Sequence, residues 1–264
     1  MLNINKMEQF SATVSKICNV KKPKQAENSI SIIDNYLENT DFKQAERVLI
    51  YNPDAIGMWL YQKYNDLFVK VIEHAPICIP VQSVMPSVTP VAFGTMYTGV
   101  SPSIHTITKY EKKLITIDSL FDALSRDNKK VALISVQDAS MSVIFNERNI
   151  DYYIMPYDQE VNEKAKEIIN SDLYDVVVVY NQEYDDVMHK TGTESKESIN
   201  ALKNHIKSFD ELSIVARNSW KDKNHCLIWA TDHGIHDLEN GLGTHGSDLE
   251  EDLNVLHFYG FYKV

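Results

Sequence analysis

Residues 175–189 read DVVVVYNQEYDDVMH, and this stretch contains the clearest strand signal in the chain. Residues 176–180 form a continuous apolar run, which is typical of a strand buried on both faces of a sheet. Polar residues follow at once, and Asp185 and His189 stand four positions apart. That spacing places two side chains one turn apart on the same side of a helix. The stretch therefore predicts a buried strand followed by a carboxylate and an imidazole that can point at one ion.

Short apolar runs of the same kind recur along the chain and alternate with helical patterns. Strands are predicted at residues 47–51, 77–81, 130–136, 152–155, 225–230 and 255–261. Helices are predicted at residues 55–71, 90–98, 118–126, 161–169 and 195–220. This alternation indicates an α/β fold, with a mostly parallel central sheet and helices on both faces.

The first 45 residues follow a different pattern. Residues 7–17 and 29–37 have apolar positions at helical spacing, and a basic stretch containing Pro23 separates them. We expect residues 1–45 to be a helical N-terminal extension packed on the main fold. No glycine-rich linker divides the chain, so residues 1–264 are predicted to form a single domain.

The composition restricts the class of partner. Apolar residues make up 44% of the chain and the formal net charge is −11. Such an acidic chain is not expected to bind a nucleic-acid polymer or an anionic membrane. It can still act on a small phosphorylated substrate if metal ions supply positive charge at the site.

The N-terminal residues and the cysteines predict the compartment. The first twenty residues lack a basic start followed by an apolar run, so we expect no signal peptide. No apolar stretch approaches the length of a membrane span. Cys18, Cys78 and Cys226 are far apart and odd in number, which favours a reducing compartment over a disulfide framework. A cytoplasmic location is therefore expected.

Polar residues directly after several predicted strands are the main indication of function. Asp54 follows the strand at 47–51, and Asp232 and His233 follow the strand at 225–230. Thr89 ends a polar segment that follows the strand at 77–81. Ligands of an open parallel sheet bind beyond the carboxyl ends of its strands, so these side chains are expected to meet.

Aspartate and histidine ligands suit zinc, and also manganese or iron. His245 lies in the loop Gly243-Thr244-His245-Gly246, which could fold a last ligand over the site. Together these side chains would serve two divalent metal ions. The predicted metal ligands are Asp54, Thr89, Asp185, His189, Asp232, His233 and His245.

Thr89 is the candidate nucleophile. Thr89-Pro90 reads as a helix N-cap followed by proline at the first helical position, and Gly99 would end that helix. The hydroxyl would then face a helix N-terminus, where backbone N–H groups can receive a phosphate. A metal on this oxygen would lower its pKa and make it nucleophilic.

At these residues the sequence resembles the alkaline phosphatase superfamily, and in particular its type I phosphodiesterase/nucleotide pyrophosphatase branch. The similarity runs from about residue 47 to the C-terminus. The motifs that carry it are Pro86-Ser87-Val88-Thr89-Pro90, Asp185-Asp186-Val187-Met188-His189, Asp232-His233-Gly234 and Gly243-Thr244-His245-Gly246. The resemblance implies one metal on Asp54, Asp232, His233 and Thr89. It implies a second metal on Asp185, His189 and His245, with zinc as the usual ion.

The sequence also departs from the family pattern. The first strand ends in Asn-Pro-Asp rather than Asp-Gly, and Thr106 replaces a glycine after His105. Where pyrophosphatases of this branch have a phosphate-binding asparagine, this chain has Tyr110 next to Lys109. Lys109 and Tyr110 are therefore the candidate substrate-binding residues.

Other polar residues are expected to have structural roles. His74, His205, His225 and His257 lack ligand partners nearby, and His105 is expected to hold its loop. The acidic run at 248–252 is expected to be a solvated loop. His236 and Asp237 lie near the predicted site and are secondary candidates for a substrate contact.

These observations predict a metal-dependent phosphoesterase that forms a phosphothreonine at Thr89. A phosphodiester or a nucleotide pyrophosphate is the expected substrate. A phosphomonoesterase or a phosphonate hydrolase of the same superfamily is the nearest alternative. A non-catalytic metal-binding protein on the same scaffold is the alternative from another class.

Overall fold

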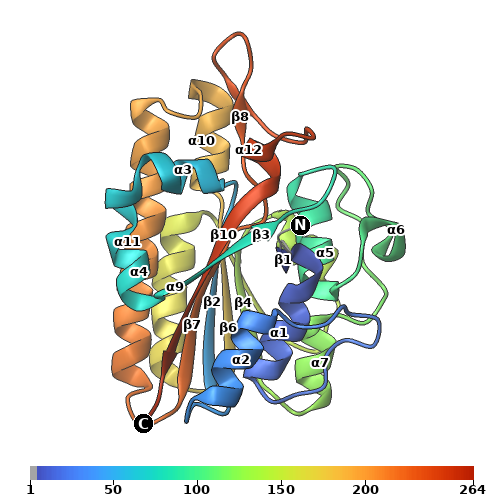
Figure 1. Ribbon diagram of the computed structural model, residues 1–264, viewed down its shortest axis with the longest axis vertical. Coiled ribbons are helices and arrows are strands. Elements are labelled where there is room, and N and C mark those ends of the chain that lie inside the picture. Colours follow the sequence, from blue (N-terminus) through green and yellow to red (C-terminus); the bar gives the residue numbers. More distant parts are fainter. Residues whose placement is uncertain (1–4) are drawn as a thin grey trace.

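The computed structural model describes residues 5–264 and contains an eight-stranded sheet in the order β1-β3-β10-β7-β2-β6-β4-β5 (Figure 1). The strands of this sheet are β1 Asn5–Lys6, β2 Arg47–Pro53, β3 Ile77–Gln82, β4 Val131–Val136, β5 Asp151–Met155, β6 Val176–Asn181, β7 His225–Ala230 and β10 Asn254–Tyr262. All pairings are parallel except the two that β10 makes with β3 and β7. The predicted mostly parallel sheet is confirmed.

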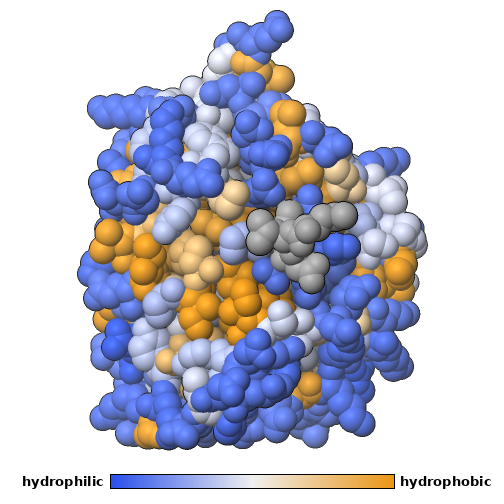
Figure 2. Space-filling model, viewed as in Figure 1, coloured by the Kyte–Doolittle hydropathy of each residue, from blue (hydrophilic) through white to orange (hydrophobic). Residues whose placement is uncertain are grey.

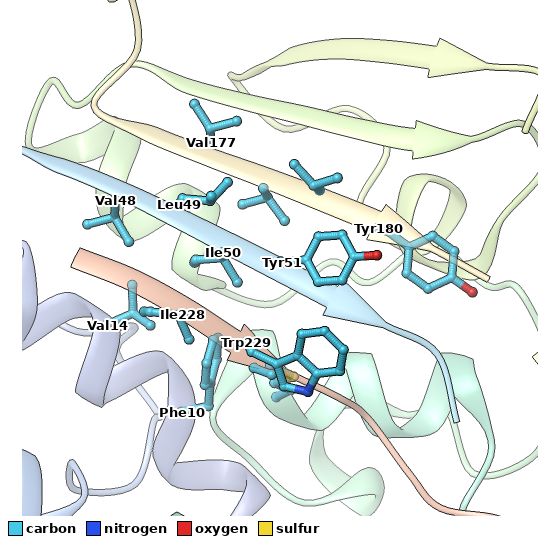
Figure 3. Packing of buried hydrophobic residues seen from close by; sticks show 14 of the residues in the cluster. Phe10, Val14, Val48, Leu49, Ile50, Tyr51, Val177, Tyr180, Ile228 and Trp229 are labelled. Atoms are coloured by element: carbon cyan, nitrogen blue, oxygen red, sulfur yellow. The ribbon is translucent and has the colours of Figure 1, made fainter. Parts of the chain in front are cut away.

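Strand β6 lies in the interior of this sheet, between β2 and β4. Its residues Val176 to Tyr180 are at most 2% exposed, which explains the continuous apolar run in the sequence. Figure 3 shows Tyr51 of β2 beside Trp229 of β7, its direct partner across the two strands. The rings of Tyr51 and Trp229 are 5.4 Å apart between centroids, so large aromatic side chains fill this part of the core.

Helices cover both faces of the sheet, as predicted. Helices α4, α9 and α11 lie on one face, and α1, α5, α7 and α8 lie on the other, with α2 packed on α1 (Figure 1). The helices are α1 Phe10–Ile17, α2 Ser31–Asn39, α3 Met58–Lys63, α4 Val69–His74, α5 Thr89–Thr98, α6 Pro102–His105, α7 Leu120–Arg126, α8 Ser140–Ile144, α9 Asp158–Ser171, α10 Glu183–Thr191, α11 Lys196–Ser219 and α12 Glu250–Leu253. Two 3-10 helices (η1 Met7–Gln9 and η2 Asn65–Phe68) precede α1 and α4.

The N-terminal helices contribute to the core. Phe10 and Val14 of α1 are at most 1% exposed and lie under the sheet in Figure 3. The Phe10 ring lies 5.7 Å from Tyr97 of α5 and 5.5 Å from His257 of β10, between ring centroids. The helices at 7–17 and 29–37 therefore form close to where they were predicted.

The single helix predicted at 55–71 is wrong. That segment is divided into α3, η2 and α4, because the backbone leaves helical geometry at Tyr64, where ψ is +38°. Lys63 forms an ion pair of 2.5 Å with Glu194, and the Tyr64 hydroxyl donates to the same carboxylate. Contacts with a residue so distant in sequence do not appear in local periodicity.

The carboxyl ends of the central strands lie together at one edge of the sheet. Pro53 at the end of β2 pairs with Asn181 at the end of β6. Asn52 donates from Nδ2 to the carbonyl oxygen of Ala230, the last residue of β7, at 2.6 Å. Residues that follow β2, β6 and β7 therefore enter the same region, where α10 and the short hairpin of β8 (His236–Asp237) and β9 (Gly243–Thr244) also lie (Figure 1).

Within the described residues, one edge of the sheet is formed by the two-residue strand β1, which lies next to β3. Strand β1 pairs only with Val81 and Gln82, and the exposed Pro80 interrupts the row of donors on β3. Figure 2 shows apolar residues gathered over this part of the sheet and hydrophilic residues around it. Within residues 5–264, none of the helices combines the length and the apolar character needed to cross a membrane.

Candidate metal centre

A first cluster of candidate ligands forms where β2 and β7 end. Asp54 directly follows β2, and Asp232 and His233 follow β7 after one residue. The Nε2 atom of His233 lies 3.4 Å from Asp54 Oδ1 and 3.3 Å from Asp232 Oδ2. All three side chains are at most 2% exposed. The three can offer one ligand atom each to a common ion.

A second cluster forms beside α10. Asp185 and His189 lie one turn apart on this helix, and His245 comes from the loop after β9. Asp185 Oδ1 lies 3.4 Å from His189 Nε2 and 3.3 Å from His245 Nε2. The two Nε2 atoms are 3.2 Å apart. These three side chains are therefore also arranged to share one ion.

The two clusters are adjacent, and Thr89 lies beside the first. The imidazole rings of His233 and His245 stack with centroids 4.1 Å apart. Thr89 Oγ1 is 3.3 Å from His233 Nε2 and 3.5 Å from Asp54 Oδ2. The structure thus brings together all seven residues that the sequence suggested as metal ligands.

Backbone carbonyls fix the orientation of the three imidazoles. The Nδ1 atoms of His189, His233 and His245 lie 3.0, 3.0 and 2.9 Å from the carbonyl oxygens of Gly243, Gly234 and Ser87. A carbonyl only accepts, so each Nδ1 carries the proton and each Nε2 keeps its lone pair. Metal-binding histidines are commonly held in this way, with the free nitrogen directed at the ion.

One buried carboxylate oxygen of each aspartate has no hydrogen-bond partner within the described residues. These oxygens are Asp54 Oδ1, Asp185 Oδ1 and Asp232 Oδ2. Leaving a buried charged oxygen unpaired is costly, because it loses its hydration and gains nothing in return. Each of the three lies within 3.4 Å of an imidazole Nε2 of its own cluster. Orphaned oxygens beside free imidazole nitrogens form the donor set that a divalent cation requires, so these residues fit two metal ions.

A cleft of about 530 Å³ opens above the two clusters. Of the predicted site residues, its lining includes Asp54, Thr89, Tyr110, Asp185, His189 and His245. Lys109 is not part of this lining. Its side chain is 75% exposed and lies 3.9 Å from Glu111, so the structure separates it from its neighbour Tyr110.

Comparison with known proteins shows which solved structures share this fold. Neither a protein-family sequence model nor a curated protein matches the chain. Human ectonucleotide pyrophosphatase/phosphodiesterase 5 superposes with a TM-score of 0.57 at 18% identity, over 73% of this chain and 58% of that chain. The periplasmic domain of a phosphoethanolamine transferase from Campylobacter jejuni superposes with a TM-score of 0.57 at 13% identity, over 83% of this chain and 80% of that chain. Phosphonoacetate hydrolase from Sinorhizobium meliloti superposes with a TM-score of 0.54 at 14% identity, over 75% of this chain and 59% of that chain.

The chain has the fold of the alkaline phosphatase superfamily. The resemblance inferred from four sequence motifs is thereby confirmed for the fold. The chain spans 58% of the length of the human phosphodiesterase and 59% of the phosphonoacetate hydrolase.

In this alkaline phosphatase-like chain, burial shifts the pKa values of the first cluster. Burial, together with the nearby charges of Asp232 and Asp185, raises the pKa of Asp54 well above its usual value. Burial raises the pKa of Asp232 to about 7, and it lowers the pKa of His233 to about 3. Without a cation, the cluster therefore resists carrying charge.

The second cluster behaves differently because it is less enclosed and contains two imidazoles. Burial acts to raise the pKa of Asp185, but its interactions with the nearby imidazoles of His189 and His245 outweigh burial and hold the pKa below its usual value. The nearby carboxylate of Asp185 raises the pKa of His189. The carboxylate of this cluster is therefore ionised and ready to bind a cation.

The position of Thr89 differs by one residue from the prediction. Thr89 is the first residue of α5, and Val88, in an extended conformation, occupies the N-cap. The prediction assigned the hydroxyl to the cap because Thr89 directly precedes Pro90, and proline favours the first helical position. Within the described chain no side chain caps α5, and Thr89 is the residue of this helix that lines the cleft. The predicted end of the helix at Gly99 is confirmed by its φ of +75°.

Several residues of the cleft were missed by the sequence reasoning. Tyr180 of β6 donates a hydrogen bond from its hydroxyl to Asp54 Oδ2. Gln137 and Asp138 directly follow β4 and line the cleft, so the strand-end rule would have found them if it had been applied there. Lys112, Ser140, Gln182 and Asp186 also line the cleft, and no motif marks them.

Histidines expected to be structural have partners away from the clusters. His105 Nε2 lies 2.9 Å from the Thr95 hydroxyl and holds its loop against α5. His74 Nε2 is 2.7 Å from Asp210 Oδ1, and His205 Nδ1 is 3.0 Å from the Tyr51 hydroxyl. These contacts agree with structural roles.

The expectation of a solvated loop at residues 248–252 is wrong in two respects, because Glu250–Leu253 form helix α12 and one of the acidic side chains is buried. Asp248, Glu250 and Glu251 are exposed, but Asp252 is 0% exposed. Asp252 Oδ1 lies 2.7 Å from His236 Nδ1, so it is a partner of the hairpin rather than a solvated acid. A run of like charges gives no sign that one member turns inward.

Proposed function

We propose that this protein is a metal-dependent phosphoesterase in which the hydroxyl of Thr89 is the nucleophile. The observation that carries the proposal is the position of Thr89 Oγ1, 3.3 Å from His233 Nε2, at a cleft that two carboxylate–imidazole clusters line. The names of similar structures include a pyrophosphatase/phosphodiesterase and a phosphonoacetate hydrolase, which supports chemistry at phosphorus.

Two divalent cations are proposed as cofactors, with zinc preferred and manganese as the alternative. Asp54, Asp232, His233 and Thr89 would hold one ion, and Asp185, His189 and His245 would hold the other. When bound, such ions supply the positive charge that lowers the pKa of a hydroxyl and neutralises phosphate oxygens. The mixed oxygen and imidazole donors suit zinc.

The residues of the chain divide the work of the reaction. The oxygen of Thr89 forms a bond to phosphorus while the bond from phosphorus to the leaving oxygen breaks, which gives a phosphothreonine. Water then cleaves that ester and restores the hydroxyl. At the start of α5, the backbone N–H of Thr89 would donate to the phosphate, because Pro90 has no N–H and the N–H groups of Val91 and Ala92 donate to the Val88 carbonyl oxygen.

Tyr110 is the proposed substrate-binding residue of the cleft. Its phenol can donate a hydrogen bond to a phosphate oxygen, a role given to an asparagine in the sequence pattern that this chain resembles. Tyr110 lines the cleft together with Thr89, whereas Lys109 is exposed and does not line it. We therefore rest the substrate contact on Tyr110.

The charge of the cleft favours a diester or a nucleotide pyrophosphate over a monoester. Among the lining residues, Lys112 is the only basic side chain other than histidine, and its Nζ donates to the Asp138 carbonyl oxygen at 2.5 Å. A monoester carries a second negative charge that cationic side chains normally balance.

The cysteines are free, which supports the reducing, cytoplasmic location.

Hydrolysis of two chromogenic substrates tests the proposed reaction. Zinc-loaded protein should hydrolyse bis-p-nitrophenyl phosphate with a higher kcat/KM than p-nitrophenyl phosphate. The reverse order would favour the phosphomonoesterase, and hydrolysis of phosphonoacetate alone would favour the phosphonate hydrolase. Zinc-loaded protein that is inactive on all three would support the non-catalytic metal-binding protein instead.

A further inference from the structure

Asp252 of α12 is a fully buried carboxylate outside both metal clusters. Its Oδ2 atom accepts a hydrogen bond from the backbone N–H of Ser247 at 2.9 Å, and the Ser87 hydroxyl lies 3.4 Å from the same oxygen. Its Oδ1 atom lies 2.7 Å from His236 Nδ1. One side chain therefore binds three segments that are distant in sequence.

These contacts reach the segments that carry three of the candidate ligands. Ser87 is two residues before Thr89, and Ser247 is two residues after His245. The carbonyl oxygen of Asp252 also accepts from the N–H of Gly234 at 2.7 Å, directly after His233. Asp252 thus lies where the nucleophile segment, the Asp-His-Gly turn and the His245 loop meet.

Ser87 extends the contact of Asp252 to the ring of His245. The backbone N–H of Gly246 donates to Ser87 Oγ at 3.1 Å. The Nδ1 atom of His245 donates to the carbonyl oxygen of Ser87 at 2.9 Å. Ser87 therefore fixes both the backbone after His245 and the rotation of its imidazole.

His245 depends on such support because its own element is short. It follows the two-residue strand β9, in a hairpin whose tip at residues 238–242 is exposed. Yet its Nε2 lies 3.3 Å from Asp185 Oδ1 and its ring stacks on His233 of the other cluster. A small tilt of this loop would change the geometry of both clusters.

We propose that Asp252 is a positioning residue of the metal centre, which holds the 245–247 loop against the nucleophile segment so that His245 stays directed at Asp185. This inference rests on the proposed metal-dependent function. The positioning role explains why Asp252 is buried whereas the other acidic residues of the segment 248–252 are exposed. Groups that orient metal ligands from outside typically change metal affinity by about 10- to 100-fold when they are replaced.

Zinc affinity in metal-free protein tests this role without using activity. Asp252→Asn keeps the size of the side chain but removes its charge and leaves one acceptor oxygen in place of two, so it cannot accept from both the Ser247 N–H and His236 Nδ1. In titrations against a chromophoric chelator, one of the two zinc ions should bind about 10- to 100-fold more weakly. Asp248→Asn is the matched control, because Asp248 is exposed and lies four residues earlier.

Two further measurements separate positioning from a general effect on folding. Cobalt(II) absorption should change in Asp252→Asn and stay unchanged in Asp248→Asn, because the spectrum reports the coordination geometry. Ser87→Ala should weaken the binding of the same zinc ion. The double variant that combines Ser87→Ala with Asp252→Asn should lose less zinc-binding free energy than the sum of the losses in the two single variants, since both changes act through one contact.

The outcomes differ for the inference and for the proposed function. If folded Asp252→Asn binds two zinc ions with unchanged affinity and cobalt spectrum, the positioning role is wrong and the metal centre stands. If Asp252→Asn does not fold, Ser87→Ala decides, and unchanged affinity in that variant overturns the inference. If the wild-type protein binds no zinc, both the inference and the proposed function are wrong.

Discussion

At the residue scale, the unpaired oxygens of Asp54, Asp185 and Asp232 are the most informative atoms of the molecule. Each is buried and lies next to an imidazole nitrogen whose lone pair is free. Folding alone does not favour such an arrangement, because buried charges are stable only when they are paired or bound to a cation. The clusters therefore point to a ligand that brings positive charge.

The raised pKa of Asp232 makes a prediction for the metal-free protein. Its pKa rises from 3.8 to about 7 on folding, so its contribution to stability is present below about pH 4 and is lost as the pH rises through 7. Asp232→Asn should stabilise the metal-free protein above pH 7 by on the order of 2 kcal/mol. It should also reduce, without abolishing, the stabilisation that zinc gives to the wild type, because the second cluster keeps its ligands. Urea unfolding at pH 5 and pH 8 measures both effects. Equal stability of variant and wild type at pH 8 would contradict this account.

Thr89→Ala tests the nucleophile separately from the metals. Loss of the hydroxyl should lower turnover by more than about a thousand-fold, because it removes the oxygen that forms the proposed covalent bond. Zinc content should remain at the wild-type value, since six other ligands stay in place. Thr89→Ser is the control and should retain measurable activity. Full activity in Thr89→Ala would exclude the phosphothreonine route.

The residues of the clusters were accessible from sequence because each follows a strand or a short motif. Asp54, Asp232 and His233 come directly after β2 and β7, where parallel strands deliver side chains to one edge. Tyr180 was not accessible, because it belongs to the apolar run of β6 and only the structure shows its hydroxyl bound to Asp54. Asp252 was hidden among exposed acidic neighbours for a similar reason.

At the element scale, the turn after β7 is packed tightly against α12. A Cβ atom added at Gly234 would overlap the carbonyl oxygen of Glu251. The N–H of Gly234 also donates to the carbonyl oxygen of Asp252 at 2.7 Å. The glycine of the Asp-His-Gly motif is therefore required by a close backbone approach.

Gly234→Ala should displace this turn and the ligands that precede it. We expect a loss of about 1–3 kcal/mol in unfolding free energy, typical of forcing an atom into a packed site, and weaker zinc binding. Denaturant unfolding and a zinc titration measure the two effects. Glu239→Ala, at the exposed hairpin tip, is the control. Wild-type stability in Gly234→Ala would show that the turn can relax.

Helices and strands were predicted where local pattern and tertiary packing agree. Strands β6 and β7 and helix α11 have long uniform patterns, and they formed within a few residues of the predicted bounds. The segment 55–71 failed because contacts of Lys63 and Tyr64 with Glu194 end α3. The antiparallel direction of β10 could not be predicted either, because strand direction depends on the path of the whole chain.

At the scale of the whole molecule, the N-terminal helices belong to the core. Phe10 is 1% exposed and contacts α5, the helix that begins with Thr89. Phe10→Ala should lower the unfolding free energy by about 3–5 kcal/mol because it leaves a large cavity. Ile32→Ala, at a position that is 50% exposed on α2, should change it by less than about 1 kcal/mol. Similar small effects for both variants would mean that the N-terminal segment is peripheral.

The acidity of the whole chain connects the fold to the metals. A net charge of −11 disfavours a phosphate anywhere on the surface unless cations are held nearby. The two clusters concentrate three aspartates and three histidines at the carboxyl edge of the sheet. Bound cations would compensate this local charge and would stabilise the folded state by mass action.

Metal content is the most direct test of the central claim. Protein purified without chelators, dialysed against zinc and freed of unbound metal should contain two zinc ions per chain by elemental analysis. Asp54→Asn and Asp185→Asn should each lose one of the two, because they belong to different clusters. A stably folded wild-type protein that contains no metal after this treatment would contradict the ligand assignment and the proposed function.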